Sequence, residues 1–310
     1  MSPTTGEGII TEQGSNLREK TGAEETLFSE DLRKLVKRVD NLPTLPQVVS
    51  RMVSAMANPG TSAADIEKII STDQAITAKM LKVVNSSFYS FSRRIGSVCE
   101  AVVMLGFNTI RNLAITCSLF HTFKGQNWEG FDQRRFWDHS IGAAVFSRYL
   151  GRRLASSIDG EDLFVMGLLH DIGKLVLEQF CPDRFEAVLA RMRDDGVSFL
   201  QAETDETGVT HAEIGRWLCT QWNLPSRLAE AVGQHHEPHA ATEAIRACAL
   251  VHLANAFCHQ RGLSPTGPAG GSPLSKKALD ILKIVPGMLP EIEQEITEEQ
   301  ERAQDFFTLY

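Results

Sequence analysis

GLLHDIGKL, at residues 167–175, places an adjacent His170–Asp171 pair inside a run with helical apolar spacing. Charged groups are seldom buried without a partner, so the pair predicts a specific role inside the fold. One imidazole nitrogen and one carboxylate that can bridge cations form a usual ligand set for a transition metal. Further histidines that could join them from separate helices occur at His139, His211, His235 and His236. Convergence of these six side chains would create a site for one metal ion or two.

Outward from this stretch, apolar residues recur at helical spacing, with segments expected at about 133–156 and 161–180. In the first half, Ser62 and Asp73 are predicted to cap helices at 62–71 and 73–85. Two further helices are expected at 97–105 and 108–121, divided by Gly106. Strand signals are nearly absent. The pattern predicts an all-α helical bundle.

The chain divides into four predicted parts. Residues 1–28 lack apolar periodicity and are expected to form a flexible tail. The next two parts are an N-terminal helical half at 29–125 and a metal-binding helical half at 133–260. A segment rich in Pro, Gly and Ser at 263–273 reads as a loop before C-terminal helices within 274–310.

The composition is that of a globular protein of 310 residues, 43% hydrophobic and 23% charged, so bulk disorder is excluded. A net charge of −8 offers no basic face, and direct nucleic-acid binding is not expected. The six cysteines form no CxxC pair, which favours reduced thiols in a cytoplasm. Without a signal peptide or an apolar run of about 18 residues, neither export nor membrane insertion is expected.

Taken singly, the histidines have ordinary explanations. His139 could lie on the surface, and His211 could simply begin a helix. The His235–His236 pair, close to a proline, could belong to a solvated turn. The other histidines are expected to be structural or exposed: His121, His239, His252 and His259.

The order of these residues resembles the HD superfamily of metal-dependent phosphohydrolases. In that family a His, a His-Asp doublet, another His, a His or His-His pair and a last Asp hold one or two metal ions. The resemblance implies that His139, His170 and Asp171 share one coordination shell. It also implies that Asp171 bridges to a second metal ion, whose other ligands are His211, His235 and His236.

Three neighbouring features refine this resemblance. Lys174 matches the lysine that HD-GYP phosphodiesterases use near the substrate phosphate, although it could also be a helix-surface lysine. Asn255 stands where the last Asp is expected, and its amide oxygen is a weaker ligand than a carboxylate. No Gly-Tyr-Pro follows the doublet, so hydrolysis of cyclic di-GMP is not expected.

The first half carries a second resemblance. Its motifs are LPTLP at 42–46, IISTDQAITAKMLKVVNS at 69–86 and AVVMLG at 101–106, which together look like an HDOD domain. HDOD proteins are HD relatives that serve as output modules in bacterial signalling, and many have lost metal ligands. The resemblance therefore implies a regulatory module that acts through signalling partners and has little or no catalysis. Asn255 favours this reading.

The alternative is a working phosphohydrolase acting on a phosphoester or nucleotide, with Asp171 and Lys174 as catalytic residues and a metal ion that activates water. Oxygen-dependent di-iron chemistry is a third alternative, known in other HD relatives. The first two predict an anion such as phosphate at the cations. The expected cofactor is one or two divalent metal ions, with iron or manganese favoured and zinc also compatible.

Overall fold

The computed structural model describes residues 30–32, 35, 44–123, 128–154, 157–267, 274–304 and 306–308. Within them the protein is all-helical, and the only extended pairing is an isolated bridge between Trp128 and Phe131. The all-α prediction is thus confirmed. The tail predicted at 1–28 lies outside the described residues.

The helices of the first half are α3 (Gln47–Met56), α4 (Ala63–Ile70), α5 (Gln74–Val84) and α6 (Val98–Thr122). The second half contains α7 (Gln133–Arg153), α8 (Gly160–Leu169), α9 (Ile172–Phe180), α10 (Pro182–Asp195), α11 (Phe199–Thr207), α12 (His211–Gln221), α13 (Ser226–Gly233), the short η1 (Pro238–Ala240) and α14 (Ile245–Gln260). The C-terminal part contains α15 (Lys276–Leu282), η3 (Pro286–Met288), α16 (Leu289–Arg302) and η4 (Phe306–Thr308).

The caps predicted for the first half form as expected. Ser62 and Asp65 exchange hydrogen bonds in a capping box at the start of α4. The Asp73 carboxylate accepts hydrogen bonds from the backbone amides of Ala75 and Ile76, the second and third residues of α5. Gly106 has φ 83° and ψ 164°, and this break divides α6 where the sequence predicted two helices.

Helix α6 contains a run that is long and apolar enough to cross a membrane, so the sequence-based expectation that no such run exists is wrong. Its residues Val98–Phe120 meet that test by length and composition, with a mean hydropathy of 1.3. Half of this window is buried, however, and the helix packs on α3, α4, α5 and α8. Because the core helix of a folded domain passes the same test, the finding is weak support for a membrane span.

The segment predicted as one helix at 161–180 is two helices, α8 and α9, which meet at His170 and Asp171. Asp171 has φ −101° and ψ 4°, outside the helical range. The break turns α9 onto α12 so closely that a Cβ atom on Gly173 would overlap the carbonyl oxygen of His211. The doublet therefore lies at a corner between helices rather than inside one.

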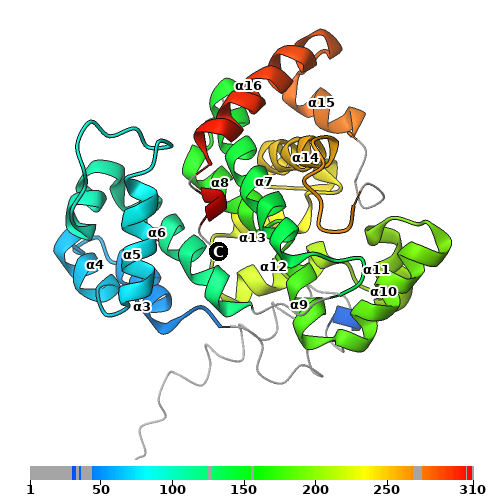
Figure 1. The fold of residues 1–310 in the computed structure, drawn as a ribbon, viewed down its shortest axis with the longest axis horizontal. Coiled ribbons are helices and arrows are strands. Elements are labelled where there is room, and N and C mark those ends of the chain that lie inside the picture. The colour runs from blue at the N-terminus through cyan, green and yellow to red at the C-terminus, as the bar shows by residue number, and fades with distance from the viewer. Residues whose placement is uncertain are drawn as a thin grey trace, which may run out of the picture.

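Figure 1 shows how the parts are arranged. Helices α3 to α5 stand to one side, and α6 leads from them toward the centre of the molecule. Helices α7, α8 and α14 pack on one another and are almost entirely buried along their middle turns. Helix α16 lies over α7, and α12 packs on α9 and α13. The side chains of the predicted metal site come from the helices of this central group.

Candidate metal centre

The predicted ligands come from four places in the fold. They are His139 in the middle of α7, His170 and Asp171 at the corner between α8 and α9, His211 at the first turn of α12, and His235 and His236 directly after α13. None of them is exposed by more than 1% except His236, which is half-buried. A surface position for His139 and a solvated turn at His235 are therefore excluded. His211 does begin a helix, behind the N-cap Thr210, and is buried as well.

One cluster consists of His139, His170 and Asp171. The Nε2 atoms of the two histidines lie 3.1 Å apart. Asp171 Oδ2 is 3.3 Å from Nε2 of His139 and 3.5 Å from Nε2 of His170. These three donor atoms face a common point, as a shared cation requires.

The second cluster consists of His211, His235 and His236. Nε2 of His236 lies 2.9 Å from Nε2 of His211. The other oxygen of the Asp171 carboxylate, Oδ1, is 3.0 Å from Nε2 of His211 and 3.8 Å from Nε2 of His235. Asp171 therefore turns one oxygen to each cluster, which is the arrangement of a bridging carboxylate.

Backbone carbonyl groups fix which nitrogen of three rings carries the proton. In each ring Nδ1 donates to a backbone carbonyl oxygen at 2.7 Å. His139 donates to Leu263, His170 to Gly167, and His235 to Val232. A carbonyl oxygen only accepts, so in a neutral ring Nε2 carries the lone pair. Burial lowers the pKa of His170 to about 3 and that of His235 well below its ordinary value. Both rings are therefore neutral, with Nε2 free to bind a cation.

Two observations indicate that these donor atoms fit a metal ion. Nε2 of His235 and Oδ1 of Asp171 are buried without a hydrogen bond of good geometry, a costly state for polar atoms. In addition, Nε2 of His139 and Nε2 of His170 lie 3.1 Å apart while Nδ1 of each ring donates to a carbonyl oxygen, so a hydrogen bond between the two Nε2 atoms would need an added proton and its positive charge. Metal–nitrogen bonds of about 2.0–2.2 Å place neighbouring ligands about 3–3.5 Å apart, close to the separations described above.

Glu203 of α11 is a supporting residue that the sequence reading missed. Its carboxylate accepts from Nδ1 of His211 at 2.6 Å and from the backbone amide of His211 at 2.8 Å. Burial by itself would lower the pKa of His211, but the Glu203 charge raises it. Such a carboxylate orients the ring and fixes which nitrogen faces the site. Glu203 is followed in the sequence by Thr204, Asp205 and Glu206, so it resembles one residue of an exposed acidic stretch.

Lys174 is buried beside the centre, so its reading as a helix-surface lysine is wrong. Its exposed fraction is 4%, and Nζ donates to Asp171 Oδ2 at 2.7 Å. The ammonium group also lies 5.0 Å from the ring centroid of Phe199. Although burial works against ionisation, the imidazoles and this ammonium hold the pKa of Asp171 well below its usual value.

Helix α14 brings two more polar side chains into this region. Asn255 is 2% exposed, and its Oδ1 has no hydrogen-bond partner within the described ranges. His259, four residues later and so on the same helix face, has its ring centroid 4.9 Å from that of His139. Burial lowers the pKa of His259 to about 3. His259 belongs to neither cluster, so the expectation that it is structural or exposed is not contradicted. Its spacing from Asn255 could have signalled its place beside His139.

The remaining histidines behave as expected where the structure describes them. His252 donates from Nδ1 to the carbonyl oxygen of His235 at 2.8 Å, and its Nε2 accepts from the amide of Ser275. It therefore holds the His235 turn in place. His239 is exposed. The side chain of His121 lies outside the described part of the chain.

The family model of the HDOD domain matches residues 42–238 of the chain, from the first predicted motif to just past the His235–His236 pair. This chain belongs to the HDOD family. The match stops before α14, so Asn255 and His259 lie beyond it.

Solved structures share the fold of this HDOD chain. An HDOD domain protein of unknown function from Geobacter sulfurreducens is 26% identical, with a TM-score of 0.73 over 90% of this chain and 97% of that one. A Marinobacter aquaeolei protein, provisionally described as a signal transduction protein, is 23% identical, with a TM-score of 0.72 over 90% and 65% of the two chains. A Shewanella amazonensis protein, provisionally described as a metal-dependent phosphohydrolase, is 22% identical, with a TM-score of 0.61 over 89% and 96%.

Among curated proteins, an uncharacterized protein of Treponema pallidum (strain Nichols) is 28% identical over 224 residues. The aligned region covers 71% of the HDOD chain and 43% of the relative. The chain thus spans less than half the length of that relative.

Proposed function

We propose that this HDOD chain is an output module of bacterial signal transduction that holds two divalent cations and acts through protein contacts, with little or no catalysis. The observation that carries the proposal is the Asp171 carboxylate, which presents one oxygen to each of two buried imidazole clusters. The family supplies the signalling context. The free cysteines favour a reducing cytoplasm as the compartment.

The first cation would be held by His139, His170 and Asp171. Asp171 would share the second with His211, His235 and His236. Two divalent cations amid neutral imidazoles and one carboxylate would supply net positive charge, which favours a phosphate or nucleotide anion. Iron or manganese suits this donor set, and zinc is compatible with it.

The chain's own residues act to orient the ligands and to exclude water. The carbonyl groups of Leu263, Gly167 and Val232 fix the rings through Nδ1, and Glu203 does the same for His211. Among the six ligands only His236 is appreciably exposed to solvent, so a substrate would have narrow access to the centre. Together with the neutral amide at Asn255, this closed setting favours a regulatory centre over rapid turnover of a bulky substrate.

Phosphohydrolysis is the second candidate, and the buried Lys174 favours it. Its ammonium group is 2.7 Å from the bridging carboxylate, where it could steady the negative oxygen of a phosphoester. Activity would then require both Lys174 and Asp171. A regulatory module needs them only to hold the cations and the fold.

The test is metal analysis of the purified full chain, with phosphodiesterase assays on bis(p-nitrophenyl) phosphate and on nucleotides. We expect His170→Ala and His235→Ala each to lower the bound metal. His239→Ala, which changes an exposed histidine, should leave it unchanged. Unchanged metal content in both site variants would remove the metal centre. Two bound equivalents with turnover that is lost in Asp171→Ala would replace the regulatory proposal by the hydrolase.

A further inference from the structure

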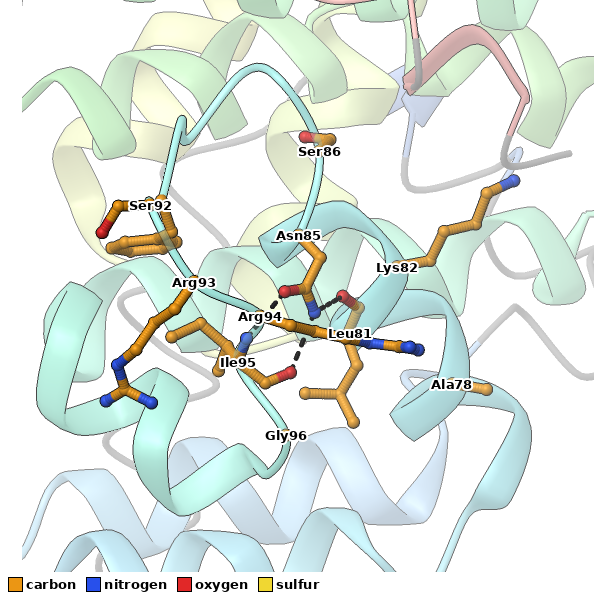
Figure 2. A pocket seen from close by; sticks show the side chains of 11 residues that line it. Ala78, Leu81, Lys82, Asn85, Ser86, Ser92, Arg93, Arg94, Ile95 and Gly96 are labelled. Atoms are coloured by element: carbon orange, nitrogen blue, oxygen red, sulfur yellow. Dashed lines mark hydrogen bonds between the residues drawn. The ribbon is translucent and has the colours of Figure 1, made fainter.

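A cavity of about 890 Å³ lies in the first half of the chain, between α5 and the loop that leads to α6 (Figure 2). Its lining residues fall between positions 78 and 96, and none belongs to the metal centre. Its volume is within the range of about 300–1,000 Å³ that is usual for small-molecule sites. The cavity is thus large enough for a ligand of nucleotide size.

The wall of this cavity is held in place by one side chain. Asn85 donates from Nδ2 to the carbonyl oxygens of Leu81 at 2.8 Å and of Ile95 at 2.9 Å. Its Oδ1 accepts from the amide of Ile95 at 2.7 Å. Figure 2 shows these bonds as a tie between the end of α5 and the loop opposite. Because Ile95 is 1% exposed, the tie is anchored in the core, and the cavity is preformed.

Positive charge lines the cavity without a carboxylate in its wall. The cations are Lys82, Arg93 and Arg94. Arg93 forms an ion pair with Glu100, outside the lining. Lys82 donates to Thr308 Oγ1 at 3.1 Å, a neutral acceptor, and it forms no ion pair with any residue that the structure describes.

Arg94 is the cation most available to a ligand. In the described part of the chain its guanidinium has no hydrogen bond or ion pair, and the side chain is exposed. Figure 2 shows the Arg93 and Arg94 side chains leaving the loop in different directions, with Arg94 extending toward the α5 side. A guanidinium presents paired N–H donors that match the oxygens of a phosphate or carboxylate.

A second polar group in the lining lacks a partner. Ser86 is 6% exposed, and its Oγ is buried without a hydrogen bond to any described residue. Leaving a hydroxyl unsatisfied is costly, and a ligand oxygen would satisfy it. The last carbonyl groups of α5 would repel an anion, but Leu81 already accepts from Asn85 and Val83 accepts from the amide of Ser86.

We infer that this cavity binds a phosphate-bearing small molecule, with Arg94 as the main contact and Lys82 and Ser86 as further donors. The volume and the apolar side chains of Leu81 and Phe91 in the wall favour a nucleotide over a free phosphate anion. The inference does not depend on the metal centre, since the two share no residue.

The test is calorimetric titration of the full chain as purified, with inorganic pyrophosphate and with adenosine triphosphate. We expect saturable binding that weakens as salt is raised. Arg94→Gln should weaken it about tenfold, because a charge-assisted hydrogen bond is lost, and Ser86→Ala about threefold. Tighter binding of the nucleotide would assign the site to nucleotides. Equal affinity for both probes would assign it to free phosphate anions, the other source of the same chemistry.

Two controls separate this site from its alternatives. Arg51→Gln removes an exposed arginine of α3 that does not line the cavity, and it should bind as wild type does. His170→Ala disables the metal centre, and this variant should also bind pyrophosphate and adenosine triphosphate with wild-type affinity. Loss of binding in His170→Ala would place the anion at the metal centre and overturn the inference. So would Arg94→Gln binding both probes like wild type, or the absence of saturation by either probe at millimolar concentration.

Discussion

The metal centre and the cavity beside α5 are built in opposite ways. The centre gathers side chains spread from His139 to His236, and nearly all of them are shut off from water. The cavity is made by one continuous stretch, residues 78–96, and its cations stay exposed. Buried polar groups must be matched to partners, whereas exposed cations are satisfied by water. The centre should therefore couple ligand binding to folding, and the cavity should not.

The loop between α5 and α6 nevertheless packs on the helices that carry part of the metal centre. The ring of Phe88 packs on Phe306 at 4.7 Å and on Phe164 of α8 at 6.1 Å between centroids. The guanidinium carbon of Arg148, on α7, lies 4.2 Å from the centre of the Phe88 ring. Helix α7 also carries His139, and His170 directly follows α8. Substitutions in each region can therefore be compared within one connected scaffold.

The largest effect is expected from Asp171→Ala. The variant removes the one carboxylate shared by both clusters and leaves the Lys174 ammonium buried without its partner. Breaking such a pair on one side costs about 3–5 kcal/mol of unfolding free energy, and both metal ions should be lost. Urea denaturation of metal-free protein and metal analysis would measure the two effects. Adding Lys174→Met should restore part of the stability but no metal, and strict additivity of the two changes would contradict the pairing.

Gly173→Ala is expected to cost somewhat less. The added methyl group would overlap the carbonyl oxygen of His211, forcing α9 and α12 apart and moving Asp171 from the second cluster. Overpacking against backbone lowers the unfolding free energy by about 3 kcal/mol, and metal affinity should fall with it. Gly287→Ala is the matched control, because nothing lies within 4 Å of its Cβ position. A stable Gly173→Ala protein with unchanged metal affinity would show that the corner tolerates movement.

His259→Ala should leave the fold nearly intact and act on the metal. The ring lies beside His139 without belonging to either cluster, so its loss should loosen the first cation by about tenfold, as expected for a supporting residue. His239→Ala removes an exposed histidine and serves as the control. Calorimetric titration of metal into stripped protein would compare them. Equal affinities in the two variants would make His259 a packing residue only.

The helices and most of the clustering residues could be predicted because both produce recognisable patterns in the sequence. Apolar spacing and caps at Ser62 and Asp73 follow from local physics, and a His-Asp pair in an apolar run stands out against its neighbours. The corner at His170 and Asp171 did not show, because it arises from the contact of Gly173 with α12. Glu203 left no mark either, since an acidic residue among acidic residues resembles a solvated surface.

The cavity left no mark for a related reason. Lys82, Arg93 and Arg94 look like ordinary surface cations, and only the fold shows that they share a wall with the unpartnered hydroxyl of Ser86. The ties made by Asn85, which shape this wall, reach across ten residues to Ile95. A site that depends on the shape of a loop, and on charged residues that are equally common on exposed surfaces, has no periodic pattern in the sequence that would predict it.

The smallest effect on stability is expected from Arg94→Gln. The guanidinium has no partner among the described residues, so its removal breaks no contact, and the unfolding free energy should change by less than about 0.5 kcal/mol. Removing one of several like charges near Lys82 and Arg93 could even stabilise the protein slightly at low salt. Urea denaturation at low and high salt would measure this. A large destabilisation would mean that Arg94 supports the fold, and the contrast between a centre tied to folding and a cavity independent of it would then fail.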